Sequence, residues 1–368
     1  MKTRNIFFLL AAIILLSDCQ TAKQTQDMYP HSAAEFVRDM GIGINIGNTL
    51  DSIGTNTWFA GETGWGNPRI SRSFIRALKD YGYKTIRLPV TWAENMGPAP
   101  DYEINEDWMY RVEEVVGWIL AEDMYCILNL HHDGGGADKS WIRKAAGNPD
   151  GVIKQFAAVW TQIARRFSGA SEKLIFEAMN EVAVPYPVLN RLNQTFVDTV
   201  RASGSNNASR FLLIAGYDTD IDRTRNIAYL MPKDTSANKL ILSIHYYTPS
   251  TFCIAEQPNN SWGFRSDWGS EATRDADMAE LQGQFAKLKL PFLDRGIPVI
   301  IGEYGVTTMN KAEEGRVRWM TAVTQICLDY GMCPVLWDTG GDIKRNSPFA
   351  MSDPLAAVWE NIKSANKL

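Results

Sequence analysis

The sequence predicts an α/β fold, a single (β/α)8 TIM barrel, and three observations support this fold class. Eight short apolar or β-branched runs alternate with longer amphipathic segments, a pattern typical of parallel strands that are joined by helices. The chain has 368 residues, of which 45% are hydrophobic, and this is enough for one large core. No internal repeat and no Pro/Ser-rich linker marks a second domain.

Each predicted strand is an apolar run that ends in polar or small residues. The strands are expected at residues 41–47, 85–90, 125–131, 174–181, 210–217, 240–247, 298–305 and 333–340. In a barrel of this type the active site lies at the carboxyl ends of the strands. Polar side chains at these ends are therefore the candidates for function.

The amphipathic segments between the strands predict helices. They are expected at residues 71–83, 107–124, 152–167, 278–293, 313–330 and 354–367. Ser71 and Ser73 can cap the first helix, and Asp353 followed by proline opens the last one. Gly82 and Gly331 stand where a left-handed helix end is expected.

The N-terminus predicts an export signal, because two basic residues precede an unbroken apolar run at residues 6–16. Residues 16–19 resemble a bacterial lipobox with Cys19 as the lipid site, although Asp18 stands where a small residue is usual. A periplasmic protein, an outer-membrane lipoprotein and an extracellular protein all remain open. The chain is thus divided into a signal at 1–19, a polar tether at 20–30 and the barrel domain at 31–368.

The composition excludes several classes of partner. The net charge is −5 at pH 7, and no run of Lys and Arg could follow phosphates or anionic lipids. We therefore expect no nucleic-acid partner, no membrane contact except through a lipid on Cys19, and a monomer. The five cysteines form no CxxC pair, and Cys126, Cys327 and Cys333 have apolar neighbours, which favours inert buried thiols. Disulfide pairing stays open.

Two glutamates stand near the carboxyl ends of different strands. Glu181 ends the fourth predicted strand, and Glu303 lies near the end of the seventh. Because all strands point the same way, both side chains would reach the same mouth of the barrel. Hydrolysis of a glycosidic bond requires such a pair, since one carboxyl group protonates the departing oxygen and the other attacks or stabilises the sugar carbon. Either glutamate alone would be more typical of a salt bridge.

Further polar and aromatic residues are expected at the same mouth. They are Arg87, His131, His132, His245, Tyr247 and Trp337. Side chains alternate between the two faces of a strand, so His245 and Tyr247 would point the same way. By the same rule His131 and His132 would diverge, which argues against a metal pair, and Asp133 is expected to face solvent. We expect no metal and no cofactor.

In their sequence context these residues resemble glycoside hydrolase family 5. The motifs are IRLP with Arg87, LNLHHD with His131, FEAMNE with Asn180 and Glu181, SIHYY with His245 and Tyr247, IIGEYG with Glu303 and VLWD with Trp337. The segments INIGNTLD, ETGWGNP and RLPVTW further resemble a bacterial subfamily of endoglucanases, xyloglucanases and lichenases. One departure is Val182, because many members have proline after the acid/base glutamate.

The resemblance implies a retaining endo-β-1,4-glucanase that hydrolyses cellulose, mixed-linkage glucan and xyloglucan through a covalent glycosyl-enzyme. Glu303 would be the nucleophile, held ionised by Arg87 and Tyr247. Glu181 would be the acid/base and would hydrogen-bond His245. Retention is expected if the two carboxyl groups are about 5–5.5 Å apart.

The resemblance also implies residues that bind the substrate. Asn180 would bind the 2-hydroxyl of the cleaved sugar, and Trp337 would form the platform beneath that sugar. The nearby hydroxyls would be bound by Asn48, His131 and His132.

An endo-acting enzyme needs a groove with several sugar sites, and aromatic faces suit sugar rings. The candidates in predicted loops are Trp58, Trp65, Trp92, Trp141, Trp262 and Trp268. Singly, each is more typical of the core. The long loop at residues 248–273 is rich in Ser, Asn, Gly and Trp and is expected to form a wall of the groove.

Three alternatives remain. A mannanase or xylanase would keep the mechanism and change the sugar, although the segments ETGWGNP and GNTLD favour glucan. A barrel isomerase or lyase would need a metal or a phosphate loop, and GIGINIGN lacks the GxGxxG spacing. A non-catalytic surface glycan-binding lipoprotein would not require both Glu181 and Glu303.

Overall fold

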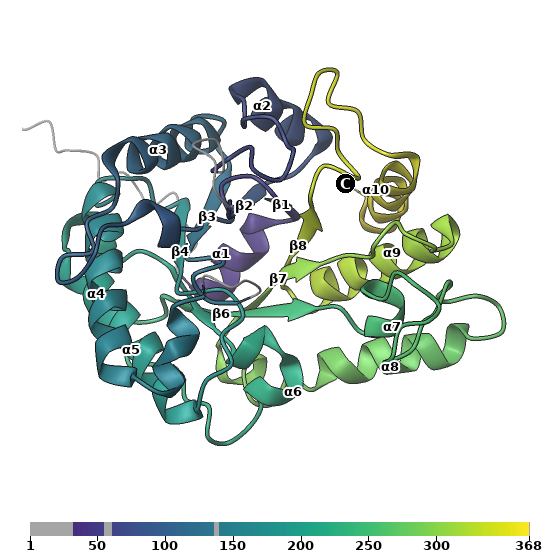
Figure 1. The fold of residues 1–368 in the computed structure, drawn as a ribbon. Coiled ribbons are helices and arrows are strands. Elements are labelled where there is room, and N and C mark those ends of the chain that lie inside the picture. Colours follow the sequence, from purple (N-terminus) through teal and green to yellow (C-terminus); the bar gives the residue numbers. More distant parts are fainter. Residues whose placement is uncertain (1–31, 55–60, 136–139, 368) are drawn as a thin grey trace, which may run out of the picture.

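The computed structural model describes residues 32–54, 61–135 and 140–367. Within them, the parallel strands pair in chain order, and pairing of the first with the eighth closes the barrel. Helices surround the ring of strands (Figure 1), so the predicted (β/α)8 TIM barrel is confirmed. The strands are β1 Gly43–Ile46, β2 Thr85–Leu88, β3 Tyr125–Asn129, β4 Leu174–Glu177, β5 Leu212–Ala215, β6 Leu240–Tyr246, β7 Val299–Tyr304 and β8 Cys333–Asp338.

The strands are shorter than predicted, chiefly at the mouth of the barrel. β4 ends at Glu177, and the chain beyond it leaves the sheet before Glu181. Glu181 has a left-handed φ of 40°, which is incompatible with a strand. Glu181 thus stands on a loop, whereas Arg87, His245 and Glu303 lie within β2, β6 and β7.

The outer layer consists of helices of unequal length. They are α2 Arg72–Tyr81, α3 Glu106–Ala121, α4 Pro149–Arg166, α5 Tyr186–Ala202, α6 Ile221–Thr224, α7 Ser250–Cys253, α8 Arg274–Ala286, α9 Glu313–Asp329 and α10 Asp353–Asn366. Ser71 caps α2 by accepting a hydrogen bond from the Phe74 amide, whereas Ser73 lies inside the helix. Gly82 ends α2 with a φ of 109°, as its position in the sequence predicts.

A helix that the sequence did not predict closes the floor of the barrel. In α1 (Ala33–Met40), Ser32 and Glu35 form a reciprocal capping box. Figure 1 shows α1 in purple at the centre of the ring of strands. The fully buried Phe36 stacks on Phe211 at 3.7 Å between ring centroids and meets the edge of Tyr125 at 5.1 Å. The helix therefore seals the end of the core opposite the mouth.

Replacement of Phe36 by Ala is expected to lower the free energy of unfolding by about 3–5 kcal/mol, because it leaves a cavity under the strands. Urea unfolding measures this change. Tyr110→Ala is the control, since that side chain is 61% exposed and its loss should change the stability by less than about 0.5 kcal/mol. Equal effects of the two substitutions would contradict the role of α1 as a floor.

The ladder between β6 and β7 is irregular beside the predicted site. Its register shifts between Ile244 and His245, and beyond the shift His245 pairs with Glu303. The β7–β8 ladder shifts as well, between Ile301 and Tyr304. Such irregularities re-aim side chains next to active sites. Here they turn both His245 and Glu303 into the mouth.

The cysteines among the described residues are all free and buried. The predicted burial of Cys126, Cys327 and Cys333 is therefore confirmed. Burial raises the pKa of the Cys126 thiol well above its usual range, which disfavours the reactive thiolate. The predicted signal, tether and Cys19 lie outside the described residues. Among the helices that the structure describes, none is long and apolar enough to cross a membrane.

Candidate active site

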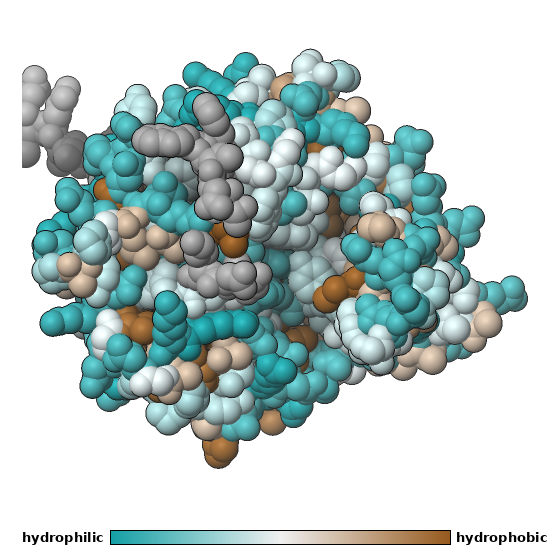
Figure 2. Space-filling view, viewed as in Figure 1, coloured by the Kyte–Doolittle hydropathy of each residue, from teal (hydrophilic) through white to brown (hydrophobic). Residues whose placement is uncertain are grey.

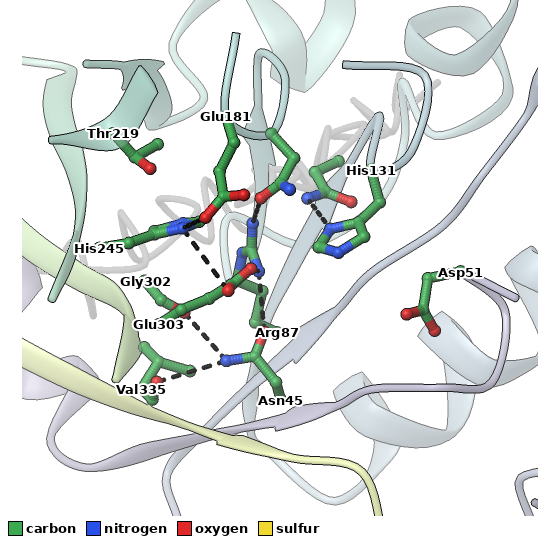
Figure 3. Close-up of polar contacts among 12 residues, drawn as sticks. Asn45, Asp51, Arg87, His131, Glu181, Thr219, His245, Gly302, Glu303 and Val335 are labelled. Carbon is green, nitrogen blue, oxygen red and sulfur yellow. Dashed lines mark hydrogen bonds and ion pairs between the residues drawn. The ribbon is translucent and has the colours of Figure 1, made fainter. Parts of the chain in front are cut away.

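The structure brings the two predicted carboxylates together across His245. The His245 Nδ1 atom is 2.9 Å from Glu181 Oε1 and 3.5 Å from Glu303 Oε2. One carboxylate oxygen of each glutamate and a ring nitrogen of His245 lie within 4.8 Å of one another. Figure 3 shows the side chains of Glu181 and Glu303 facing each other beside the imidazole.

Arg87 organises the base of the site from β2. Its side chain is completely buried, and Nη1 donates to Glu303 Oε1 at 2.7 Å. Nε donates to Glu177 Oε2 at 2.6 Å, and Nη2 donates to Asn180 Oδ1 at 2.9 Å. On the other side of Glu303, the Tyr247 hydroxyl donates to Oε2 at 3.0 Å. The Glu303 carboxylate is thus held by charge-assisted hydrogen bonds on both oxygens.

Burial and charge act together on the carboxyl groups and on His245. Burial raises the pKa of Glu303, and the charges of His245 and Arg87 oppose the rise without cancelling it. Burial also raises the pKa of Glu181, but the hydrogen bond and charge of His245 outweigh it and leave this pKa below its usual value. Burial lowers the pKa of His245, and the charges of Glu303 and Glu181 outweigh it, so this pKa lies above 6.5. The two carboxylates therefore favour a protonated imidazole between them.

Four polar residues inside the barrel support this arrangement and were not predicted. Glu177, Asn45, Asn129 and Ser243 are all completely buried. Asn45 accepts from Arg87 Nη1 at 2.9 Å, and the Ser243 hydroxyl donates to Glu177 Oε1 at 2.6 Å. The signal in the sequence was a polar residue in the middle of an apolar strand, where burial requires a hydrogen-bond partner.

His131 and His132 both lie at the mouth, but the prediction that they diverge is wrong. Their ring centroids are 4.6 Å apart and meet edge to face. Because β3 ends at Asn129, both histidines stand on a turn to which strand alternation does not apply. The His131 ring lies parallel to that of Trp337, at an interplanar angle of 7° and 5.5 Å between centroids. His132 faces Asp51, with Nε2 at 3.8 Å from Oδ2.

The hydrogen bonds of His131 fix which nitrogen can donate. The Asn129 amide group donates to His131 Nδ1 at 3.2 Å, since its oxygen accepts from the Val90 amide. Burial, followed by the charge of His132, lowers the pKa of His131 well below its usual range. A neutral His131 therefore carries its proton on Nε2.

Asp51, His131 and His132 also form a group of possible metal ligands. The expectation that the protein binds no metal therefore remains a prediction.

The prediction that Asp133 faces solvent is also wrong. Its side chain is fully buried and accepts from the Trp92 amide at 2.9 Å and from Trp141 Nε1 at 2.6 Å. Burial raises the pKa of Asp133 to about 6. The turn after β3 folds back over Trp92, so Asp133 joins the loops after β2 and β3. Trp92 and Trp141 are accordingly buried structural residues.

A cavity of about 590 Å³ opens above the carboxylates. The predicted residues that line it are His131, His132, Asn180, Glu181, Tyr247, Glu303 and Trp337. Figure 2 shows a hollow near the centre of this view, with both hydrophilic and hydrophobic residues at its border. The loop after β6 contributes Cys253, Ile254 and Glu256 to the wall, as predicted for the segment 248–273. Asn48 is half-buried beside β1 and does not belong to the described lining.

The predicted loop tryptophans differ in exposure. Trp65 is 41% exposed and contacts the His132 ring at 5.3 Å between centroids. Trp262 is 48% exposed, and neither Trp65 nor Trp262 is among the described residues that line the cavity. Trp268 is 2% exposed, so its predicted role in substrate binding is wrong. Arg318 donates to the Trp268 carbonyl at 3.0 Å and holds this part of the loop against α9. Trp58 lies outside the described residues.

Replacement of Trp65 by Ala is expected to raise the KM for a β-glucan polymer about 3- to 10-fold, because an aromatic contact contributes about 0.5–1.5 kcal/mol. The KM for a short aryl cellobioside should stay the same. Trp268→Ala is the matched control, and we expect it to lower the melting temperature without distinguishing the two substrates. A Trp65→Ala protein with equal KM changes on both would show a packing role instead.

The fold and the site together define a class of enzyme. Two carboxyl groups that converge at the carboxyl-end mouth of a parallel barrel are typical of a glycoside hydrolase. The chain belongs to glycosyl hydrolase family 5, since the model of that family's cellulase domain matches residues 48–342. The predicted family is therefore correct.

Individual relatives support this assignment. Endoglucanase A of Paenibacillus barcinonensis is 35% identical over 91% of this chain and 90% of its own length. A broad-specificity endoglucanase of subfamily 4 from an uncultured bovine rumen ciliate has a TM-score of 0.82, with 36% identity over 92% of this chain and 99% of that one. A family 5 xyloglucanase from Paenibacillus pabuli has a TM-score of 0.81, with 33% identity over 89% of this chain and 99% of that one.

Proposed function

We propose that this chain is an endo-β-1,4-glucanase that cleaves β-glucans with retention of configuration, with Glu303 as the nucleophile and Glu181 as the acid/base. The observation that carries the mechanism is the separation of the two carboxylates, whose nearer oxygens lie within 4.8 Å. Inverting enzymes need about 6.5–9.5 Å between the carboxyl groups to admit a water, whereas retaining enzymes have about 5–5.5 Å.

In the first step a Glu303 carboxylate oxygen attacks the anomeric carbon. The bond from that carbon to the bridging oxygen breaks, and a proton from Glu181 goes to the departing chain. This leaves a glycosyl ester on Glu303. In the second step Glu181 removes a proton from a water, which attacks the same carbon and releases Glu303. Two displacements on one carbon restore its configuration.

The surrounding residues supply orientation and charge. Arg87 holds Asn180 by its side-chain oxygen, so the Asn180 amide nitrogen remains free to donate to the sugar 2-hydroxyl. Burial, followed by the charge of Glu303, raises the pKa of Tyr247 well above its usual range, so its hydroxyl stays protonated and donates to Glu303. His131 Nε2 and the face of Trp337 then complete the site for the cleaved sugar.

The proton that Glu181 delivers is shared with His245. In the free site the imidazole is the better base, because its pKa is raised while that of Glu181 is lowered. A sugar that fills the cavity would exclude water, and a less polar surrounding favours neutral forms over an ion pair. The proton then moves from His245 to Glu181 across the 2.9 Å hydrogen bond.

This proton sharing leads to an expected pH profile. Activity should fall in acid as Glu303 becomes protonated, at a pH above 4.5 because its pKa is raised. Activity should fall again in base as the His245 and Glu181 pair loses its proton, at a pH above 6.5 because the pKa of His245 is raised. Measurement of kcat/KM from about pH 3 to 9 tests both limbs. His245→Asn should move the basic limb, and an unmoved limb would contradict the assignment.

The substrate class follows from the relatives, which include endoglucanases and a xyloglucanase. The test is hydrolysis of carboxymethylcellulose, mixed-linkage glucan, xyloglucan, xylan and mannan side by side, with the products followed by NMR. We expect glucans to be cleaved first, with the β-anomer appearing initially. Preference for xylan or mannan would move the assignment to the alternative sugars, and an initial α-anomer would refute retention.

We also propose that the protein is exported by the signal at residues 1–19. Either the signal is removed by ordinary cleavage, or cleavage leaves a lipid on Cys19 that anchors the enzyme to a membrane. Mass spectrometry of the N-terminal peptide from the native source separates the two. An intact Met1 would contradict export. Size-exclusion chromatography with light scattering tests the proposed monomer.

A further inference from the structure

The main chain at Glu181 has an unusual conformation. Its φ of 40° lies in the left-handed region, which is costly for a residue that has a Cβ. Such a conformation persists when the surrounding structure holds it, and it is common where a side chain must be aimed precisely for function. Because β4 has already ended at Glu177, the sheet does not hold this residue. Other contacts must do so.

The loop after β3 provides a close backbone contact. A Cβ atom added to Gly135 would lie 2.4 Å from the Glu181 carbonyl oxygen and 2.9 Å from the Glu181 Cβ. A Cβ added to Gly134 would lie 2.0 Å from the Asn180 carbonyl oxygen. Both distances to oxygen are far below van der Waals contact. Two consecutive glycines therefore let this loop lie directly against the peptide groups that carry Asn180 and Glu181.

A second contact comes from the same β3–α4 connection. Arg143 Nη2 donates to the Glu181 carbonyl oxygen at 3.2 Å, and the same atom lies 3.7 Å from Asp218 Oδ1. The Asp218 amide in turn donates to the Val182 carbonyl at 3.1 Å. The two peptide groups that follow Glu181 are thus held from outside the sheet.

The loop also contacts a second residue that lines the cavity. The carbonyl oxygen of Gly135 accepts a hydrogen bond from His132 Nδ1 at 3.0 Å. Gly135 therefore touches Glu181 through its Cα and orients His132, which lines the cavity, through its carbonyl. A shift of this one residue would move both side chains.

We propose that Gly135 and Arg143 are positioning residues that hold Glu181 in its left-handed conformation and so aim its carboxyl group at His245 and the departing oxygen. This inference rests on the proposed acid/base role of Glu181. Neither residue is proposed to touch the reacting atoms. Their loss should therefore weaken proton transfer and leave nucleophilic attack by Glu303 intact.

The test compares two substrates that differ in their need for a proton. Mixed-linkage glucan has a poor leaving group that must be protonated, whereas dinitrophenolate departs from 2,4-dinitrophenyl β-cellobioside without help. We expect Gly135→Ala to lower kcat/KM for the glucan about 10- to 100-fold, part of the 10²- to 10⁴-fold that a general acid contributes. For the aryl glycoside, kcat/KM should fall less than about threefold, because its leaving group does not need the general acid. Azide should raise kcat for the aryl glycoside and give β-cellobiosyl azide.

Matched variants make the test specific. Gly147→Ala lies in the same connection with open space around it and should behave as the parent on both substrates. Arg143→Met should show the selective loss in a milder form, with Arg143→Lys closer to the parent because it keeps a donor. If Gly135→Ala does not fold, the Arg143→Met profile decides. Equal losses on the two substrates, or no loss, would overturn the inference.

Glu181→Gln distinguishes a failure of the positioning inference from a failure of the acid/base assignment. If it shows the selective loss and azide rescue while Gly135→Ala and Arg143→Met do not, the positioning inference fails and the acid/base assignment stands. If Glu181→Gln itself loses both substrates equally, the assignment of Glu181 fails, and the inference fails with it.

Discussion

Glu303→Gln is expected to lower kcat/KM for β-glucans by on the order of 10⁴-fold or more, because an amide cannot form the glycosyl ester on which both steps depend. Unlike the variants that affect Glu181, it should lose the polymer and the activated aryl glycoside alike. Added azide should restore neither. Gln has almost the same shape as Glu, so the fold should persist, although Arg87 loses one of its two anionic partners.

Covalent trapping gives a direct measurement. A 2-fluoro cellobioside with a dinitrophenyl leaving group should label the parent enzyme, and peptide mass spectrometry should find the sugar on Glu303. The Glu303→Gln protein should stay unlabelled. Glu280→Gln is the control, since Glu280 is exposed on α8 in the outer layer and its change should alter neither rate nor labelling. A label on any other residue would refute Glu303 as the nucleophile.

The sequence was sufficient to predict the barrel and the convergence of the carboxylates. Alternation of apolar runs with amphipathic segments predicts parallel strands, and parallel strands bring their carboxyl ends to one mouth whatever their separation in the chain. For that reason the sequence alone predicts that Glu181 and Glu303 lie within reach of each other. The floor helix α1 was missed although its signals stand in the sequence. Its buried residues Ala33, Phe36, Val37 and Met40 follow helical spacing, and Ser32 and Glu35 form a capping box.

Side-chain direction beyond the strand ends could not be predicted. The alternation rule applied to His131 and His132 fails because β3 stops at Asn129. Trp268 stands in a loop rich in polar residues, yet distant contacts with Arg318 and Asp277 fold that segment onto the helices and bury the indole. Exposure in a long loop depends on such tertiary contacts, and local composition does not contain them.

The polar network inside the barrel could be predicted in part from the sequence. Glu177 stands in the same strand as the residues leading to Glu181, and its burial inside the barrel would have demanded a cationic partner. Arg87 could have been recognised as that partner, since both lie inside apolar strands. What the sequence could not give is the division of one guanidinium among Glu177, Glu303 and Asn180, which depends on register and side-chain reach.

Arg87→Lys is expected to lower kcat/KM by on the order of 10²- to 10³-fold, because the positions of Glu303 and Asn180 depend on it and a misplacement of about 1 Å can have such an effect. A lysine offers one ammonium group in place of a planar fork, so it cannot reach all the acceptors that Arg87 now binds. The buried Glu177 would then lose its ion pair with the guanidinium and keep only its hydrogen bonds from Ser243 and Asn129. The free energy of unfolding should fall by about 3–5 kcal/mol.

Arg210→Lys distinguishes the loss of catalysis from the loss of stability. Arg210 is equally buried, but it lies before β5, and its guanidinium donates to main-chain carbonyls such as those of Phe167 and Leu174. Its replacement should also destabilise the fold, because several buried carbonyls lose their donors. At a temperature where both variants are folded, Arg210→Lys should retain kcat/KM within about twofold. A buried residue far from the reacting atoms affects the stability of the fold and leaves the rate of the folded enzyme unchanged. If both variants lose activity in proportion to their stability, Arg87 acts only as a structural residue. If Arg87→Lys alone loses activity, the Arg87 guanidinium holds the nucleophile in place.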